Sequence, residues 1–313
     1  MSVKDEIAKK LYSTTDVDYA HVHSPNTARL TVNGNQVVGS HLLPGLEAEA
    51  ETFEKGVKLN LTVKANTVFE NPVHLCFGVL EKSAIQKIIM KVKIEDNAKI
   101  NVFAYCTFPF AQDVLHTMDA EIYVGENAEY TYFERHIHGK DGGVKVVPKA
   151  KVELAKGAKF KTEFELIKGA VGLIDIEYDT VCGDDSVMEM EARISGKNAD
   201  VIRIREIGHL KGKNSVGLLT TKIAVQDNAT ADVYNELTAS APFARGHVDC
   251  HEIVQGNGIA SATPIVKVMH PQAHVTHEAA IGSVDSKQLE TLMARGLDED
   301  EAVDLIVQSL LNK

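Results

Sequence analysis

A short turn sequence that recurs along the chain constrains the fold more than any other feature. EDNAKI, GENAEY and AKGAKF each contain a polar pair, a small residue, a polar residue and an apolar one, and they lie 30 residues apart at Ala98, Ala128 and Ala158. After a slight slip in register, similar turns follow at Ser186, Ala199, Ala229, Gly258 and Ala273. A repeat of this length predicts structural units that stack on one another.

The segments between these turns alternate apolar and polar residues, a pattern typical of strands with one buried face. Asn, Asp and Gly suit tight-turn backbone, and a small residue after them lets the next coil stack closely. An all-β sandwich also has many short strands, but it does not need the same turn every 30 residues. The pattern therefore favours a mainly β, parallel β-helix. The clearest strand candidates are KINVFAYC, AEIYV, EYTYFE, KFKTEFEL, VIRIREI and TADVYNEL.

The two ends of the chain differ from this pattern. Residues 3–12 have helical composition, and a less regular region to about residue 60 contains strand-like ARLTVNG and acidic LEAEAETFEKG. We therefore expect a helical and irregular N-terminal cap at residues 1–60, a β-helix core at 61–284 and a C-terminal helical region at 285–313.

Two helices are expected in the C-terminal region. Asp285 with Gln288, and Asp298 with Glu301, have the spacing of helix N-caps, and Gly296 is a stop signal between them. The second helix carries a broad apolar face, which either packs on its own domain or docks a partner. That face contains Ala302, Val303, Leu305, Ile306 and Leu310.

Composition excludes several classes of protein. The 33 Lys and Arg against 44 Asp and Glu give a formal charge of −11, which disfavours nucleic acid as a partner. The chain has neither an apolar run of about 18 residues nor the apolar centre of a signal peptide, so we expect a cytoplasmic protein away from the membrane. Four scattered cysteines without a Cys-x-x-Cys pair predict reduced thiols.

The standard catalytic signatures are missing. The sequence contains no Walker-type phosphate loop and no G-x-S-x-G elbow, and HEIVQ and HEAAI lack the second His of a zincin. A β-helix carbohydrate-active enzyme stays an alternative, although sugar platforms are usually aromatic and the chain has no Trp. A purely structural β-helix is another.

Ligand-type residues are enriched near the end of the predicted β-helix. Thiolate, imidazole and carboxylate are ligands that iron or zinc use together, although surface polarity on two adjacent coils would also explain them. A flat strand sends His277 and Glu278 to opposite faces, so both can serve one metal only at a bulge, a strand end or a subunit interface. The enriched residues are His247, Asp249, Cys250, His251, Glu252, His270, His274, His277 and Glu278.

Other candidate residues lie upstream. His136 and His138 share a strand face and are expected at the surface next to a loop. Cys76 and Cys182 are expected to be buried small hydrophobes, and the apolar neighbours of Cys106 favour core packing for it as well.

Residues 244–258, ARGHVDCHEIVQGNG, and 273–311, AHVTHEAAIGSVDSKQLETLMARGLDEDEAVDLIVQSLL, resemble the SufB/SufD family of iron-sulfur cluster assembly proteins. Their combination of Arg-Gly-x-Val-Asp, His-Glu-Ala and Gln-Leu-x-x-Leu-x-x-Arg-Gly-Leu is specific. Weaker similarity begins upstream at CTFPFAQDVLH, residues 106–116, so the resemblance covers roughly residues 60–313. It implies a right-handed parallel β-helix.

The resemblance also implies a function. It implies a non-enzymatic scaffold that builds a transient iron-sulfur cluster at a dimer interface, with Cys250, Glu278 and His277 as metal ligands. All three in one chain imply a homodimer. Cys106 and Cys250 are implied to accept and relay sulfur.

The implied partners are a SufC-like ABC ATPase docked on residues 285–311, a sulfur donor such as a cysteine desulfurase system, and acceptor apo-proteins. The chain is shorter than the usual SufB and has no identifiable flavin motif, which is expected of a minimal version.

Overall fold

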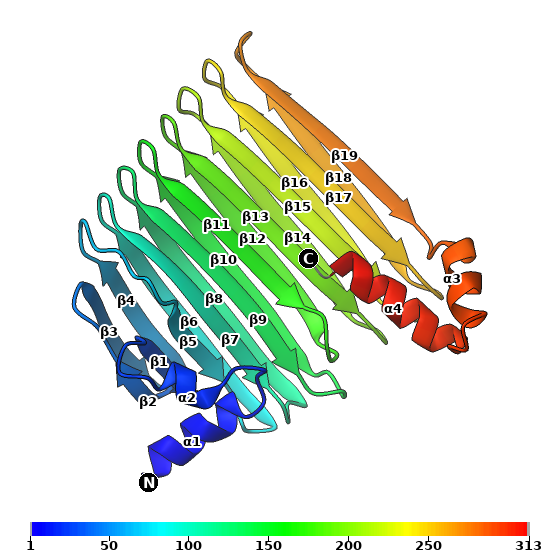
Figure 1. Ribbon diagram of the computed structural model, residues 1–313, viewed down its shortest axis with the longest axis horizontal. Coiled ribbons are helices and arrows are strands. Elements are labelled where there is room, and N and C mark those ends of the chain that lie inside the picture. Colours follow the sequence, from blue (N-terminus) through cyan, green and yellow to red (C-terminus); the bar gives the residue numbers. More distant parts are fainter. Residues whose placement is uncertain (1, 312–313) are drawn as a thin grey trace.

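The chain winds as a parallel β-solenoid, in which each coil contributes one strand to each of two facing sheets. The computed structural model describes residues 2–311, and Figure 1 shows the coils stacked from the N-terminal to the C-terminal end. The prediction of a mainly β, parallel β-helix is confirmed.

Within each sheet the strands follow the same order in space as in the sequence, except that β2 lies outside β1 at the edge of sheet A. Sheet A has ten strands in the order β19-β17-β15-β13-β11-β9-β7-β5-β1-β2, and sheet B has nine in the order β18-β16-β14-β12-β10-β8-β6-β4-β3. Sheet A consists of β1 (Arg29–Asn33), β2 (Gln36–His41), β5 (Val73–Gly78), β7 (Lys99–Phe108), β9 (Glu129–His138), β11 (Lys159–Leu166), β13 (Val187–Gly196), β15 (Val216–Val225), β17 (Arg245–Val254) and β19 (His274–Gly282). Sheet B consists of β3 (Leu46–Phe53), β4 (Gly56–Val63), β6 (Ser83–Ile94), β8 (Asp113–Val124), β10 (Val144–Leu154), β12 (Gly172–Cys182), β14 (Val201–Leu210), β16 (Thr230–Ala239) and β18 (Ile259–Val268).

The repeated turns have the predicted physical basis. Asn97 and Asn127 have φ of 57° and 54°, left-handed values that a short polar side chain tolerates. Ala98, Ala128 and Ala158 follow such residues and are almost fully buried. A larger side chain there would push successive coils apart.

The slip in register between Ser186 and Ala199 marks the change from turns at one edge of the solenoid to turns at the other. Ala98, Ala128, Ala158 and Ser186 lie where the chain passes from sheet B to sheet A, whereas the turn containing Ala199 leads from sheet A back to sheet B. Each coil therefore has two turns, one at each edge of the solenoid, and the series of similar turn sequences contains both kinds.

Asp200 takes the buried position in the turn containing Ala199. Ala199 itself is exposed, whereas Asp200 is 3% exposed. Its carboxylate accepts hydrogen bonds from the backbone N–H groups of Gly172 at 2.8 Å and Lys197 at 3.0 Å. The buried position of this turn therefore holds an aspartate and not a small residue, because its carboxylate accepts hydrogen bonds from the backbones of two coils.

The N-terminal region combines helices and strands. Helix α1 (Val3–Tyr12) forms where helical composition predicted it, and α2 (Tyr19–Val22) is a single turn. Strands β1 and β4 already pair in parallel with β5 and β6 of the solenoid. The region expected to be irregular is thus largely strand, and the expected boundary at residue 60 falls inside β4.

The two C-terminal helices form with the predicted caps. Helix α3 spans Ser286–Met293, and the Asp285 side chain accepts from the Gln288 N–H at 2.7 Å. Helix α4 spans Glu299–Leu311, and the Asp298 side chain accepts from the Glu301 N–H at 2.8 Å. Figure 1 shows α3 beyond the last strands, at the end of the solenoid away from α1, and α4 running back toward the middle strands.

The apolar face of α4 divides into two parts. Val303, Val307 and Leu311 pack in a buried cluster with Ala224 of β15 and Val284. The buried Arg193 side chain of β13 donates to the Leu311 carbonyl at 2.8 Å and anchors the end of the helix. Of the residues predicted for this face, Ala302 and Val303 are buried, Ile306 and Leu310 are partly buried, and Leu305 is 47% exposed.

All four cysteines are buried and free, as expected for reduced thiols. Within residues 2–311, no helix combines the length and the apolar character needed to cross a membrane.

Candidate functional site

Cys250 lies inside the solenoid, one coil below its C-terminal end. It is 0% exposed and pairs in register with Thr221 of β15 and Ala279 of β19. The Asn235 side-chain amide, from the facing strand β16, donates to Cys250 Sγ at 3.7 Å. Burial raises the pKa of the thiol.

Glu252 shares the inward face of β17 with Cys250. It is 2% exposed, and the Thr221 hydroxyl of the neighbouring strand is a polar group beside it. Burial raises the pKa of Glu252 to about 7, although the Thr221 hydroxyl acts in the opposite direction.

His277 and Glu278 lie on opposite faces of the last strand, β19. His277 pairs with Val248, whose side chain points into the core, and Glu278 pairs with Asp249, whose side chain points outward. His277 and Glu278 are both exposed. The opposite-face expectation from the sequence therefore holds.

The three predicted ligands do not converge within one chain. Cys250 is enclosed, His277 stands one coil further on, and Glu278 faces outward. Among residues 2–311, the groups with metal-binding spacing instead comprise His247, Asp249 and Glu278 on the outer face, and Cys106, His116 and Glu134 inside the solenoid.

The terminal coil itself is uncovered. His277, Ala279 and Ile281 occupy the positions on β19 that are inward on β17, yet all are exposed because no further strand follows them in this chain. Ile281 is 48% exposed, and Met269, in the turn before β19, is 72% exposed. The solenoid thus ends in an apolar surface with an unpaired strand edge.

The expectation that His136 and His138 lie at the surface is wrong. They share a strand face, but that face points inward, and the two side chains are 2% and 8% exposed. The signal was available: His136 and His138 have the same parity as Tyr130 and Tyr132 of the same strand, which are core residues.

His136 belongs to a buried polar cluster around Cys106. His136 Nε2 lies 2.6 Å from Glu134 Oε1, and the Cys106 thiol donates to the same oxygen at 3.5 Å. Burial and the Glu134 charge raise the pKa of Cys106 well above its usual value. The expectation that Cys106 is a core residue is confirmed, and sequence reasoning missed His116 and Glu134 beside it.

Polar side chains also line the interior between Cys106 and Cys250. Glu134, Phe164, Ala192, Thr221 and Cys250 form one inward column on successive strands of sheet A. Facing them on sheet B, Tyr178, Glu206 and Asn235 are register neighbours. Burial raises the pKa of Glu206 to about 8.

Several of these interior groups lack partners. Glu206 Oε2 and Asn235 Oδ1 have no hydrogen-bond partner within the described part of the chain. An unpaired buried polar group costs roughly 1–3 kcal/mol, so a row of them is unusual in a core. These groups lie on neighbouring strands and form a polar row inside a largely apolar solenoid.

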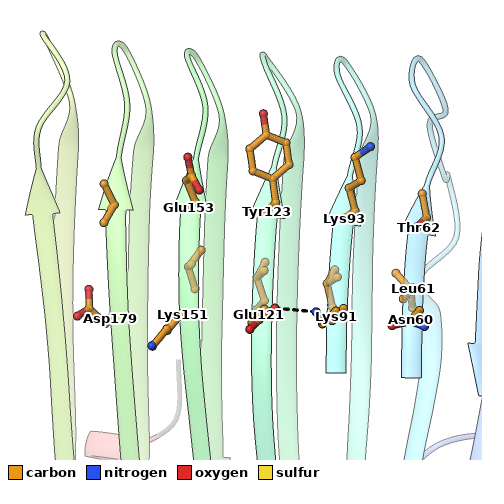
Figure 2. A pocket seen from close by; sticks show the side chains of 14 residues that line it. Asn60, Leu61, Thr62, Lys91, Lys93, Glu121, Tyr123, Lys151, Glu153 and Asp179 are labelled. Atoms are coloured by element: carbon orange, nitrogen blue, oxygen red, sulfur yellow. Dashed lines mark ion pairs between the residues drawn. The ribbon is translucent and has the colours of Figure 1, made fainter. Parts of the chain in front are cut away.

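The outer face of sheet B carries a shallow hollow of a different kind. Figure 2 shows rows of lysine and carboxylate side chains on neighbouring strands around Tyr123. Lys91 pairs with Glu121 at 3.2 Å, and both side chains are largely exposed. Paired, solvated charges of this kind do not resemble the free carboxylate pair of a carbohydrate-active enzyme.

The fold and the site together define a β-solenoid protein with thiol, imidazole and carboxylate groups inside it and an open terminal coil. Residues 81–310 match the family model for the SUF system FeS cluster assembly, SufBD core domain. The chain therefore belongs to the SufBD family of iron-sulfur cluster assembly proteins.

Relatives of similar length agree with this assignment. The chain is 35% identical over 316 residues to an iron-sulfur cluster assembly SufBD family protein of Methanocaldococcus jannaschii, with 99% of each covered. It is 36% identical over 286 residues to a family member of Pyrococcus horikoshii, covering 91% of this chain and 87% of that protein. The match to iron-sulfur cluster assembly protein SufB of Bacillus subtilis is 23% identical and covers 52% of that protein, in agreement with a minimal version.

Proposed function

We propose that this chain is the scaffold on which a nascent iron-sulfur cluster is built, at an interface between two copies of its open terminal coil. The observation that carries this proposal is Cys250, enclosed one coil below an end at which His277 and Ile281 are uncovered. Iron and sulfide are the cargo of such a site.

A homodimer supplies what one chain lacks. The unpaired edge of β19 and the exposed side chains of Ile281 and Met269 form a surface suited to a second copy. Two-fold symmetry places His277 and Glu278 of both chains at one interface. Within a single chain these two residues face opposite directions, so the second copy is needed for them to serve one cluster with Cys250.

The proposed ligand set suits transfer of a cluster. A thiolate binds iron strongly, whereas imidazole and carboxylate hold it less firmly than further thiolates would. A mixed set therefore permits a transient cluster to leave for acceptor apo-proteins. Glu252, a buried carboxyl group with a pKa of about 7 on the same strand face, is an additional group positioned to take up a proton when Cys250 loses one.

We assign the ATPase-docking surface to the groove between α3 and α4. Leu292 of α3 and Leu305 and Leu310 of α4 line it, together with Ile253 of β17. Ile253 follows Cys250 by three residues, so a force on the helices acts near the proposed cluster site. ATP hydrolysis is expected in a SufC-like partner, because this chain has no phosphate-binding loop.

We further propose Cys106 as the residue that accepts sulfur. Its thiolate would attack the outer sulfur of a persulfide on a donor such as a cysteine desulfurase, forming Cys106 persulfide and releasing the donor thiolate. Five strand spacings separate β7 from β17, about 24 Å, so sulfur has to travel onward. Glu206, Asn235 and Thr221 line that path.

Anaerobic reconstitution with iron and sulfide tests the scaffold role. Cys250→Ala should abolish the visible absorption and the bound iron and sulfide, whereas Cys182→Ala, an equally buried thiol, should retain both. Glu278→Ala should lower the yield. A normal cluster yield from the Cys250 variant would contradict the proposal.

The docking surface has a matched test. Leu305→Glu should weaken binding of the ATPase at least tenfold, while Phe110→Glu should not, although both side chains are 47% exposed. Equal affinities for the two variants would show that the groove is not the docking surface.

A cytoplasmic location is part of this proposal. Four free buried thiols are typical of a reducing compartment, in which persulfide and ferrous iron also persist.

A further inference from the structure

A second group of ligand-type side chains lies deep inside the solenoid, away from the open end. Cys106 of β7, His116 of β8 and Glu134 of β9 are 1%, 2% and 2% exposed. One ligand atom from each lies within 4.8 Å of the other two. A thiol, an imidazole and a carboxylate from three strands of two sheets therefore meet in a space closed to solvent.

The hydrogen bonds of Gln86 determine which nitrogen of His116 is free. The Gln86 side-chain amide nitrogen donates to the carbonyls of Gly34 at 2.8 Å and Gly78 at 3.1 Å. Its oxygen must then face His116 Nδ1, which lies 2.8 Å away and has to be the donor. In the neutral ring this leaves Nε2 with an unshared lone pair.

An imidazole oriented in this way has the arrangement found in metal sites. Metal-bound histidines almost always donate their second nitrogen to a carbonyl or carboxylate, which holds the ring in place. Gln86 is 0% exposed and fills that role for His116. Backbone carbonyls from two strands in turn hold Gln86.

Glu134 has one satisfied oxygen and one free one. Oε1 lies 2.6 Å from His136 Nε2, and Oε2 has no partner among the described residues. The unpaired oxygen leaves this buried carboxyl group able to accept a further bond.

The charges and distances fit a divalent ion. One thiolate, one carboxylate and one neutral imidazole around a divalent cation have a net charge of zero, which suits an apolar interior. Bonds of about 2.3 Å to sulfur and about 2.0 Å to oxygen at tetrahedral angles place the two ligand atoms about 3.5 Å apart. Cys106 Sγ and Glu134 Oε1 are 3.5 Å apart.

We propose that Cys106, His116 and Glu134 bind one divalent transition-metal ion, of the class of Zn²⁺ and Fe²⁺, inside the solenoid. Metal binding between Cys106 Sγ and Glu134 Oε1 displaces the thiol proton that Oε1 accepts. This site goes beyond the scaffold function and does not depend on it. While the metal is bound, Cys106 is not available as a sulfur acceptor, so the ion would control that step.

Metal content of the purified protein tests the site. All variants carry Cys250→Ala, so that the proposed interface site contributes no metal. Protein from cells supplied with zinc and iron should retain about one ion per chain after washing with EDTA. The Glu134→Gln and His116→Asn variants should retain less than a tenth of that, whereas Cys182→Ser should retain it in full.

Cobalt provides a second readout that reports the ligands directly. Protein from cells supplied with Co²⁺ should show a thiolate-to-cobalt charge-transfer band in the near ultraviolet, which Cys106→Ser removes and Cys76→Ser leaves. Absence of both metal and band from a folded parent protein, or their persistence in the Glu134→Gln variant, would overturn the proposal.

The metal site and the proposed sulfur acceptor can be told apart. His116→Asn should lose the metal but keep the Cys106 thiol, and with it persulfide labelling by a sulfur donor. Loss of labelling together with unchanged metal content in that variant would contradict the metal assignment without affecting the scaffold.

Discussion

The surroundings of Cys106 and those of Cys250 contain the same kinds of residue, but the pKa values of their buried glutamates shift in opposite directions. Each thiol points inward from sheet A, and each has a buried glutamate beside it, Glu134 in one case and Glu252 in the other. Glu134 has the His136 imidazole at 2.6 Å and a lowered pKa, whereas Glu252 has a Thr221 hydroxyl beside it and a pKa of about 7. A nearby imidazole thus decides whether a buried carboxyl is charged.

The two surroundings also differ in what covers them. On sheet A, β9 to β19 lie on one side of the Cys106 strand and β5, β1 and β2 on the other, whereas β19 is the one described strand beyond the Cys250 strand. Under the proposals above, the first site is closed and holds a resident ion, and the second lies next to an end that a partner completes.

Removal of the imidazole should affect the Cys106 region most. His136→Leu leaves the buried Glu134 charge unpaired and should lower the free energy of unfolding by about 3 kcal/mol, measured by urea denaturation. The double variant His136→Leu/Glu134→Leu should recover most of this loss. A single-variant effect below about 1 kcal/mol would show that His136 does not stabilise the carboxylate.

The pH dependence of stability should have opposite signs in the two regions. Glu252 has a raised pKa, so its contribution is full below pH 4.5 and is lost as the pH rises to about 7. Glu252→Gln should therefore stabilise the protein by about 3 kcal/mol at pH 8 relative to pH 4.5. Glu134 has a lowered pKa, and its contribution is lost as the pH falls below 4.5.

Urea denaturation of wild type, Glu252→Gln and Glu134→Gln between pH 4 and pH 8 measures both effects. The same sign of pH dependence for the two variants, relative to wild type, would contradict the assigned charge states.

Accessibility to alkylation should separate the two thiols. All four cysteines are buried, but terminal coils open locally at lower free energy than central ones. Iodoacetamide should label Cys250 in the native protein about tenfold faster than Cys106, which corresponds to about 1.4 kcal/mol, as followed by mass spectrometry of peptides. Faster labelling of Cys106 would reverse the comparison.

Substitutions on the outer face of sheet B should change the stability of the protein very little. Lys91→Ala removes the exposed ion pair with Glu121 shown in Figure 2 and should change the free energy of unfolding by less than about 0.5 kcal/mol. A larger loss would mean that this ladder of charges stabilises the sheet as a network.

Much of the fold could be predicted from local signals. Asn97 before Ala98 adopts the expected left-handed turn, α1 forms at residues 3–12, and Asp285 and Asp298 cap their helices. These features depend on residues close together in the chain, where steric and hydrogen-bonding preferences act directly. The two turns of each coil looked like one repeat with a slip because both edges use the same turn chemistry.

The candidate sites were predictable only in part. Strand alternation correctly separated His277 from Glu278 and placed His136 and His138 on one face. The expectation that this face lies at the surface was wrong, although its parity with the core tyrosines marks it as inward. Nothing in local sequence brings His116 to Cys106, because the two residues come from different sheets.

The sequence by itself determined a stacked, mainly β chain with capped C-terminal helices and family motifs around Cys250 and Glu278. Those properties follow from side-chain periodicity and short-range backbone preferences. Only the tertiary structure decided that Gln86 orients His116 toward a buried thiol and carboxylate, and that β19 ends without a covering coil. Both depend on which strands face or follow one another across about 30 residues of chain, and that is set by the packing of whole coils.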